Sequence, residues 1–114
     1  MITGIGIDII EIERIGNLIN HYGDRFLNRI FTKNEIKYGK SKSNSESFAG
    51  MFAAKEAFIK ASGENIIDFK VIEILHNQNK KPYYKVGFDS PNENYYLSIS
   101  HNKTNAIAFC MISS

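Results

Sequence analysis

Two carboxylate residues occur in apolar segments of the sequence, where burying an unpaired acid would cost free energy. Asp8 is the only charged residue on the glycine side of an apolar segment, and Glu56 lies in an apolar run together with Lys55 and Lys60. A buried carboxylate needs a cation or a hydrogen-bond donor. If Asp8 and Glu56 converge, two hard oxygen ligands without histidine or cysteine favour Mg²⁺, with water and substrate phosphates as its remaining ligands.

Glu56 shares one helix face with Lys60, which follows four positions later. Ala49 and Ala53 lie on the same face, and these small side chains leave space beside the carboxylate. Lys60 is then placed to neutralise a phosphate oxygen near Glu56. Simpler interpretations remain open: Glu56 and Lys60 could form only a stabilising helix pair, and Asp8-x-x-Glu11 could be a capping box for a following helix.

A third polar group, Ser98-Ile99-Ser100-His101, ends a predicted strand. It lacks the G-x-S-x-G elbow of a serine nucleophile, which argues against hydrolase chemistry. We interpret Ser100 and His101 as contacts to phosphate or hydroxyl groups. Gly4-Ile5-Gly6 is not a dinucleotide-binding fingerprint, because Ile9 stands where the third glycine belongs and no second βαβ half follows.

The elements that must position these residues begin with a strand, which alternation predicts over 2–10. One face of this strand carries isoleucines, and the other carries Gly4, Gly6 and Asp8. Because glycine lets another group approach the backbone, something must lie close to that face, and we expect it to admit part of a bulky ligand.

Helical spacing predicts helices from 11 to about 22 and from 24 onward, ahead of breaks near Thr32 and Gly39. A largely buried helix is predicted over 48–61, with a capping box at Ser43-x-x-Glu46 and a left-handed end at Gly63. Four strand-like segments separated by turns follow, at 70–76, 82–88, 95–101 and 106–112. This order predicts an α+β fold, with helices packed on one face of an antiparallel meander.

The composition is that of a soluble globular protein, with 43% hydrophobic and 23% charged residues among 114 and a formal charge of +2. We expect one domain over 1–114, in the cytoplasm, because the apolar stretches are too short to cross a bilayer and no basic signal-peptide region precedes Ile2. The lone Cys110 excludes an internal disulfide and a zinc framework, and we expect it to be buried.

Positive charge is concentrated in residues 14 to 42, where seven basic residues face two acidic ones, an excess of five. The basic residues are Arg14, Arg25, Arg29, Lys33, Lys37, Lys40 and Lys42. Such a face suits an acidic partner: an acidic protein, a phosphorylated cofactor or a nucleic acid. A solvated helix face is the plain alternative. A nucleic-acid-binding module, with Phe31 and Tyr38 as stacking groups, is a rival function.

Taken together, three segments resemble the short, bacterial type of holo-acyl-carrier-protein synthase. They are Gly4-Ile5-Gly6-Ile7-Asp8, Phe52-Ala53-Ala54-Lys55-Glu56-Ala57-Phe58-Ile59-Lys60-Ala61 and Ser98-Ile99-Ser100-His101. Lesser matches are Ile30-Phe31-Thr32-x-x-Glu35 and Lys81-Pro82, and the resemblance covers essentially the whole chain. It implies a single-domain 4′-phosphopantetheinyl transferase fold that assembles as a trimer with active sites between subunits.

The activity implied by the resemblance is Mg²⁺-dependent transfer of the phosphopantetheine arm of coenzyme A to a serine of apo-acyl carrier protein. The products are holo-acyl carrier protein, for fatty acid biosynthesis, and adenosine 3′,5′-bisphosphate; neither nucleic acid nor a membrane takes part. By the same resemblance, the metal ligands are Asp8 and Glu56, and Glu56, Lys60 and His101 are catalytic. Lys60, Ser100 and His101 lie around the coenzyme A phosphates, and Arg14 and Arg25 face the carrier protein.

The chain departs from the family pattern at two places. Met51 stands where family members often carry an arginine, and Glu64-Asn65-Ile66-Ile67 replaces a glycine-rich continuation. Both departures concern expected contacts to coenzyme A. A second rival function follows from them: a non-catalytic trimer that binds carrier protein and keeps the fold without the chemistry.

Overall fold

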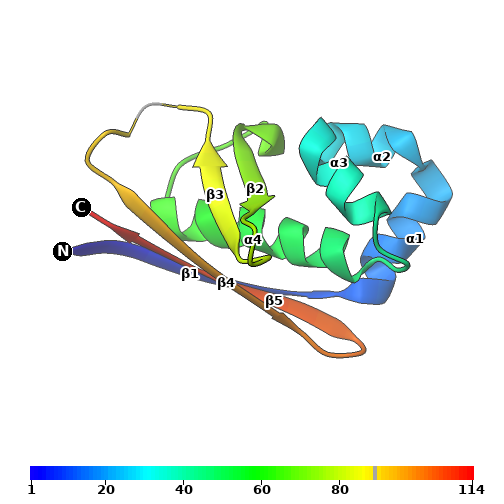
Figure 1. Cartoon of the computed structure of the whole chain (residues 1–114). Helices are drawn as coiled ribbons and strands as arrows, with labels where there is room; N and C mark the ends of the chain where they lie inside the picture. The colour runs from blue at the N-terminus through cyan, green and yellow to red at the C-terminus, as the bar shows by residue number, and fades with distance from the viewer. Residues whose placement is uncertain (89) are drawn as a thin grey trace.

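The structure, a computed structural model that describes residues 1–88 and 90–114, places one long helix between two sheets (Figure 1). In chain order the elements are β1 (Ile2–Glu11), α1 (Ile12–Tyr22), α2 (Asp24–Ile30), α3 (Lys33–Lys40), α4 (Glu46–Ser62), the short 3₁₀ turn η1 (Phe69–Val71), β2 (Ile72–His76), β3 (Pro82–Val86), β4 (Asn94–His101) and β5 (Asn105–Ser113). The predicted α+β class is therefore confirmed, and most predicted boundaries lie within two residues of the observed ones.

The strands form two antiparallel sheets instead of the single predicted meander. One sheet has the order β1-β5-β4, and β2 pairs only with β3 as a hairpin. The prediction of one meander was wrong, because β3 pairs with β2 whereas β4 pairs with β5. In the larger sheet Asp8 lies beside Ala108, and Ala108 lies beside Ile99.

The group that approaches the glycine face of β1 is α4. A Cβ atom added to Gly4 would lie 2.0 Å from the Ala61 carbonyl oxygen, and one added to Gly6 would lie 2.0 Å from that of Ala57. Glycine is therefore required at both positions for the helix to lie on the strand. The expectation that this glycine face admits a bulky ligand was wrong, because the helix backbone fills the space.

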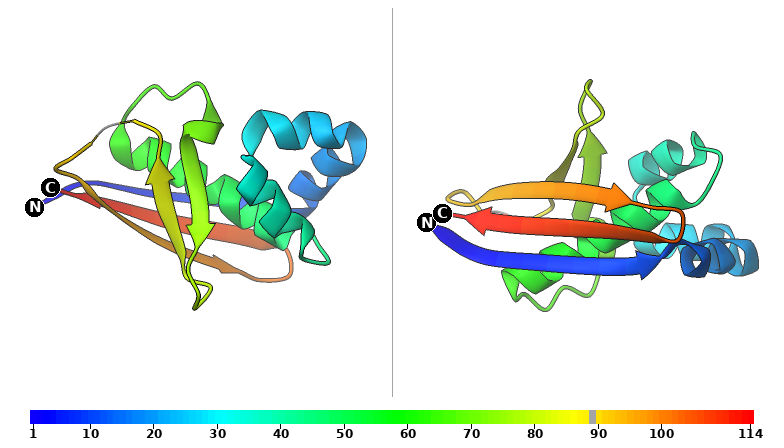
Figure 2. Two further views of the ribbon diagram at one scale, coloured as in Figure 1. Left: turned by 45° about the horizontal axis from the view of Figure 1, so that its top comes forward. Right: turned by 90° about the horizontal axis from the view of Figure 1, so that it is seen from below.

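The opposite face of the larger sheet is uncovered and apolar. Seen from below, its three strands lie in front of the rest of the chain (Figure 2). Ile5, Ile7 and Ile9 of β1 are 63%, 55% and 63% exposed, and Phe109 of β5 lies beside Ile7. The isoleucine face of the predicted strand therefore points away from the core, which lies between the sheet, α4 and the hairpin.

Helix α4 is nearly all buried, as predicted, and it ends at Gly63 in the left-handed conformation (φ 68°). Its predicted capping box at Ser43-x-x-Glu46 was wrong. The N-cap is Ser45, whose side chain makes no capping bond, and the Asn44 side-chain oxygen accepts the Glu46 N–H at 3.0 Å. The N-cap of α4, Ser45, therefore lies two residues after Ser43, the N-cap that the sequence pattern predicts.

Among the residues that the structure describes, α3 is the only helix with a full capping box. The sequence pattern did not predict α3 as a separate element. Its N-cap is Thr32, and the side chains of Thr32 and Glu35 bond each other's backbone N–H groups. The proposed Asp8-x-x-Glu11 box was wrong, because β1 continues to Glu11 and Asp8 lies inside the strand.

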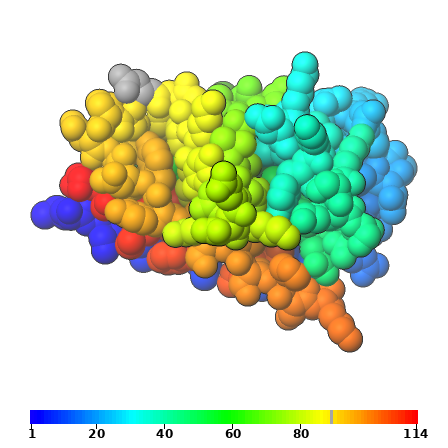
Figure 3. Space-filling model, in the orientation of Figure 1, coloured from blue at the N-terminus to red at the C-terminus, as the bar shows by residue number. Residues whose placement is uncertain are grey.

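The aromatic residues of the basic segment serve the fold. Phe31 is 1% exposed, and Tyr38 of α3 stacks on His76 at a centroid distance of 3.7 Å. The hairpin and α3 accordingly meet at the surface (Figure 3). The nucleic-acid alternative loses Phe31 as a base-stacking group. Cys110 is a fully buried free cysteine, as expected, and no helix in the described residues has the length and hydrophobicity to cross a membrane.

Candidate active site

Asp8 and Lys60 meet where the middle of β1 faces the last turns of α4. The Lys60 ammonium donates to the Asp8 carboxylate at 3.1 Å and to the Ile7 carbonyl oxygen at 3.0 Å. The Asp8 side chain is 17% exposed, whereas that of Lys60 is 54% exposed. The acid on the glycine face of the strand and the lysine on the helix stripe thus form an ion pair.

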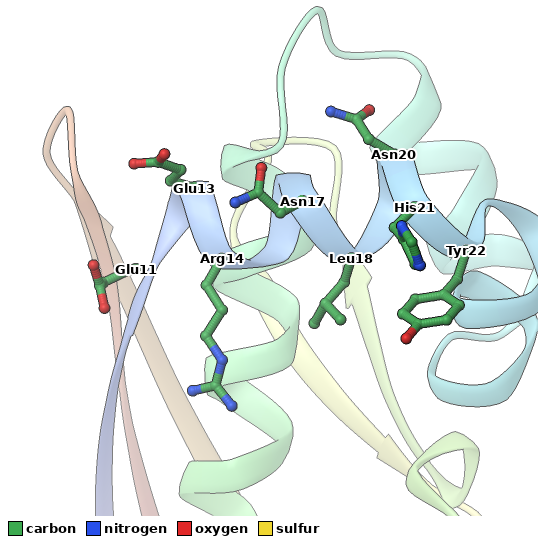
Figure 4. Close-up of a pocket in the computed structure, with 8 residues that line it drawn as sticks. All are labelled: Glu11, Glu13, Arg14, Asn17, Leu18, Asn20, His21 and Tyr22. Carbon is green, nitrogen blue, oxygen red and sulfur yellow. The ribbon is translucent and has the colours of Figure 1, made fainter.

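Glu56 belongs to the same cluster. Partial burial raises the pKa of its carboxyl group, and the nearby Asp8 carboxylate raises it further, while Lys60 and Arg14 oppose this shift. Glu56 is therefore close enough to Asp8 for the two negative charges to repel each other. Figure 4 shows that Arg14 extends from α1 alongside α4. Two acids and two bases from three elements thus influence one another.

The two carboxylates are suited to a hard divalent cation. Mutual repulsion between Asp8 and Glu56 is the condition that a bound cation relieves, and oxygen donors are the ligands that Mg²⁺ prefers. Among residues 1–88 and 90–114, no group of three or more His, Cys, Asp or Glu side chains gathers as a metal site. A cation here would have only these two protein carboxylates, which fits an ion that keeps water and phosphate ligands.

His101 lies at the other edge of the same sheet. Its strand, β4, is separated from β1 by β5. The His101 ring nitrogen Nδ1 lies 3.5 Å from a carboxylate oxygen of Glu46, at the start of α4. The predicted site residues therefore form two groups within one chain, one around Asp8 and one around His101.

Ser100 points away from His101. Successive side chains of a strand point to opposite faces, so Ser100 lies on the uncovered face of the sheet, beside Ile107. It is exposed there, together with Ser98. The structure therefore does not bring Ser100 and His101 together within one chain.

A recess of about 230 Å³ opens beside His101. It is lined by residues of α3, α4, the hairpin and β4: Tyr38, Glu46, Ser47, Gly50, Met51, His76, Lys80, Pro82, Ile99 and His101. Met51, the residue that departs from the family pattern, is 1% exposed and forms part of the wall. Burial and the positive charge of Lys42 lower the pKa of His76.

The two arginines predicted to contact a partner lie on exposed faces of α1 and α2. Arg14 borders a hollow along α1, shown with its lining residues in Figure 4. Arg25 borders a second hollow, with Arg29 and the apolar side chains of Leu18 and Phe26. Positive charge beside apolar surface is the arrangement that an acidic amphipathic partner would need.

Sequence reasoning missed a buried ion pair between Lys55 and Glu35, whose atoms are 2.9 Å apart and whose side chains are fully buried. Burial lowers the pKa of Lys55 and raises that of Glu35, and each charge opposes the shift of the other. A signal was present: Lys55 is a lysine within an apolar helix, and Thr32-x-x-Glu35 has the pattern of a capping box.

The fold is a small α+β domain in which two carboxylates and a lysine gather where β1 faces α4. Residues 4–110 match the family model of the 4′-phosphopantetheinyl transferase superfamily. The chain therefore belongs to this superfamily and is a phosphopantetheinyl transferase, as its sequence resemblance predicted.

Curated relatives and solved structures agree with this membership. Holo-acyl-carrier-protein synthase from Halothermothrix orenii is 44% identical, with 96% of this chain and 95% of the relative covered. The enzyme of the same name from Protochlamydia amoebophila is 47% identical with full coverage of both chains. The crystal structure of the Bacillus anthracis synthase in complex with CoA (3′,5′-ADP) has a TM-score of 0.85 and 40% identity, covering 98% of this chain and 96% of that one.

A second solved structure is the Helicobacter pylori holo-acyl-carrier-protein synthase in complex with coenzyme A. It has a TM-score of 0.84 and 34% identity, and the match covers 96% of this chain and 99% of that one. The likeness therefore extends over the complete fold, including the strands and the helix that carry the carboxylate cluster.

Proposed function

We propose that residues 1–114 act as one domain that transfers the 4′-phosphopantetheine group of coenzyme A to a serine of apo-acyl carrier protein. The products are holo-acyl carrier protein and adenosine 3′,5′-bisphosphate, and the reaction supports fatty acid biosynthesis in the cytoplasm. The observation that carries the proposal is the convergence of Asp8, Glu56 and Lys60 in a chain whose full-length relatives bear the name of this enzyme.

Asp8 and Glu56 are the residues that would hold Mg²⁺. When bound, the cation would neutralise the charge of the coenzyme A diphosphate and help to orient it. The raised pKa of Glu56 supports this assignment: burial is its main cause, and the neighbouring Asp8 carboxylate, whose charge a cation would neutralise, raises the pKa further.

The side chains of this cluster have distinct parts in the transfer. We assign Glu56 as the acceptor of the proton of the carrier serine, directly or through water. Lys60 stabilises the negative charge of the departing phosphate, since its flexible ammonium is a compact point charge. Positioning and charge neutralisation supply most of the acceleration in phosphoryl-type transfer, so these residues act mainly by orientation and electrostatics.

The second group of site residues joins the first across a subunit interface. Within one chain, His101 lies at the opposite edge of the sheet from Asp8, and the uncovered sheet face exposes Ile5, Ile7 and Ile9. A contiguous apolar face of this kind is typical of an interface between subunits. A homotrimer packed through these faces would let His101, Ser100 and the recess of one subunit serve the carboxylates of the next.

In this proposal, residues of both subunits at that interface contact the same coenzyme A molecule. Lys60 contacts the diphosphate, and His101 and Ser100 contact the nucleotide phosphates. Met51 supplies an apolar wall where relatives often carry an arginine, so that contact is absent. Arg14 and Arg25 attract the acidic carrier protein, and their charge raises the association rate more than the final affinity.

Chromatographic measurement of adenosine 3′,5′-bisphosphate tests the chemistry. The wild-type chain is expected to release it from coenzyme A only when Mg²⁺ and apo-acyl carrier protein are both present. Asp8→Asn and Glu56→Gln should lose this release, whereas Glu93→Gln, a loss of an exposed carboxylate outside the cluster, should keep it. Release without carrier protein, or full release by Glu56→Gln, would contradict the proposal. Metal-independent carrier binding without release would support the non-catalytic alternative.

A further inference from the structure

Lys55 is a buried cation whose three N–H donors each have an acceptor. Its ammonium lies 2.9 Å from a Glu35 carboxylate oxygen, 2.9 Å from the Phe69 carbonyl oxygen and 2.6 Å from the Ile72 carbonyl oxygen. An ammonium has three donors, so its hydrogen-bonding capacity is fully used. The side chain is 0% exposed.

The carboxylate that receives Lys55 is itself tied to two elements. One oxygen of Glu35 accepts the Thr32 N–H at 2.8 Å, at the start of α3, and the other accepts the Ile74 N–H at 2.8 Å, in β2. Through Glu35, Phe69 and Ile72, the single Lys55 side chain connects α4 with α3, η1 and β2. We call this group, Lys55 with Glu35 and their backbone partners, the Lys55 anchor.

The buried side chains of α4 do not define a single apolar face. Its buried residues point in all directions around the helix axis: Phe48, Ala49, Gly50, Met51, Ala53, Ala54, Ala57, Phe58 and Ala61. On the side of β1, Gly4 lies against the Ala61 carbonyl group and Gly6 against the Ala57 carbonyl group, which sets how closely the helix approaches the strand. Hydrophobic burial is non-directional, so the orientation of α4 depends on its directional contacts. These are the contacts of Lys55 and the hydrogen bond that the Tyr84 hydroxyl donates to the Ala54 carbonyl oxygen at 2.6 Å.

A buried ion pair is weak evidence of stability, because an apolar pair of similar volume often serves as well. The use of Lys55 therefore points to geometry. Glu56 is the next residue of α4 and projects about 100° further around the helix, toward Asp8 on β1. A helix rotation that moved Lys55 away from its three acceptors would move Glu56 by the same angle.

We infer that Lys55 is a positioning residue for the transfer reaction: the Lys55 anchor sets the rotation of α4 and thereby holds Glu56 opposite Asp8. The inference rests on the proposed function only for its kinetic consequence. The structural consequence, the placement of Glu56 and Lys60 against β1, holds whatever the substrate.

The test uses the double variant Lys55→Met with Glu35→Gln in the full-length chain, because removing both charges avoids a buried unpaired carboxylate. Glu35→Gln keeps an acceptor near the Thr32 and Ile74 N–H groups. The matched control is Ile112→Ala, which removes a buried side chain of β5 at the far end of the sheet from the anchor. Thermal unfolding of all chains identifies the temperature at which both variants are folded.

We expect the double variant to lose kcat by on the order of 100-fold, the cost of a misplacement of about 1 Å, with the KM for carrier protein unchanged. Its Mn²⁺ affinity should fall as well, because the two carboxylates separate. Its crystal structure should show the Lys60 contacts to Asp8 and Ile7 broken. Ile112→Ala should keep kcat, Mn²⁺ affinity and these contacts.

A double variant that keeps the Lys60 contacts and shows no larger loss of kcat than Ile112→Ala would overturn the inference, since the anchor would then serve stability alone. If the double variant unfolds, Lys55→Gln, which keeps two donors, is subjected to the same three measurements and judged by the same outcomes. A wild-type chain without transferase activity would refute the proposed function instead. The crystallographic comparison would still decide whether the Lys55 anchor orients α4.

Discussion

At the scale of single residues, the position of the Glu56 carboxylate lowers the stability of the fold. Its carboxylate is half-buried beside Asp8, and both burial and the neighbouring charge disfavour its ionised form. We predict that Glu56→Gln in metal-free buffer at pH 7 stabilises the fold by at most about 1 kcal/mol, because solvent screens a partly exposed charge. Thermal and urea unfolding measure this difference, and a clear loss of stability would show that the carboxylate is held by a partner instead.

The same substitution should abolish the response to metal. A ligand that binds only the folded state raises its stability in proportion to the logarithm of its concentration. We therefore predict that Mg²⁺ raises the unfolding temperature of the wild-type chain but leaves Asp8→Asn and Glu56→Gln unchanged. Equal shifts in all three chains would place the cation elsewhere.

The Cys110 thiol is unreactive in the folded chain. Burial in the centre of the larger sheet raises the pKa of its thiol to about 11, and the thiolate is the species that reacts. At pH 8 only about one thiol in a thousand would be ionised. Iodoacetamide should therefore label Cys110 only after denaturant is added, as read by intact mass. Rapid labelling of the native chain would show that β5 opens or that the thiol is accessible.

At the scale of elements, the contact between β1 and α4 positions the proposed active-site residues. A methyl group at Gly6 would lie 2.0 Å from the Ala57 carbonyl oxygen, which belongs to a helix backbone and cannot turn aside. We predict that Gly6→Ala destabilises the fold by about 3 kcal/mol and lowers activity in the remaining folded fraction. The control is Gly16→Ala in α1, where the nearest atom is the movable Ser45 hydroxyl at 3.2 Å.

Gly16→Ala should stay within about 1 kcal/mol of the wild-type stability, because alanine is the better helix former. Urea unfolding of the two variants gives the comparison. If Gly6→Ala were as stable as Gly16→Ala, the close approach of α4 to β1 would not be needed.

Local periodicity was enough to predict most of the elements. Alternation located β1, and helical spacing together with Gly63 located the end of α4, because both patterns depend on neighbours in the chain. Asp8, Glu56 and Lys60 were also singled out, since each is a charged residue in an apolar segment, but the ion pair between Asp8 and Lys60 was not predicted. The separate helix α3 was missed because its capping pair, Thr32 and Glu35, was not used as a boundary.

The arrangement of strands could not be obtained in the same way. That β1 pairs with β5, and that β2 and β3 form a sheet of their own, depends on contacts between distant parts of the chain. The distance of His101 from Asp8 is a consequence of that strand order. The buried partnership of Lys55 with Glu35 likewise requires the tertiary arrangement, because twenty residues separate them in sequence.

At the scale of the whole molecule, a shared site makes a prediction about mixed assemblies. Asp8→Asn and His101→Ala should each be inactive when pure. If a site takes Asp8 from one subunit and His101 from another, co-refolding equal amounts should restore about a quarter of the wild-type activity, since a quarter of the interfaces combine two intact halves. Light scattering checks that the mixture is trimeric. No recovery in a mixed trimer would place the complete site within one chain.

The most direct test of the central claim is the intact mass of apo-acyl carrier protein after incubation with this chain and coenzyme A. With Mg²⁺, the carrier protein should gain one phosphopantetheine arm on its serine. With EDTA, or with Glu56→Gln in place of the wild-type chain, its mass should not change. A folded wild-type chain that leaves several carrier proteins unmodified in Mg²⁺, or modifies them equally well in EDTA, would contradict the account.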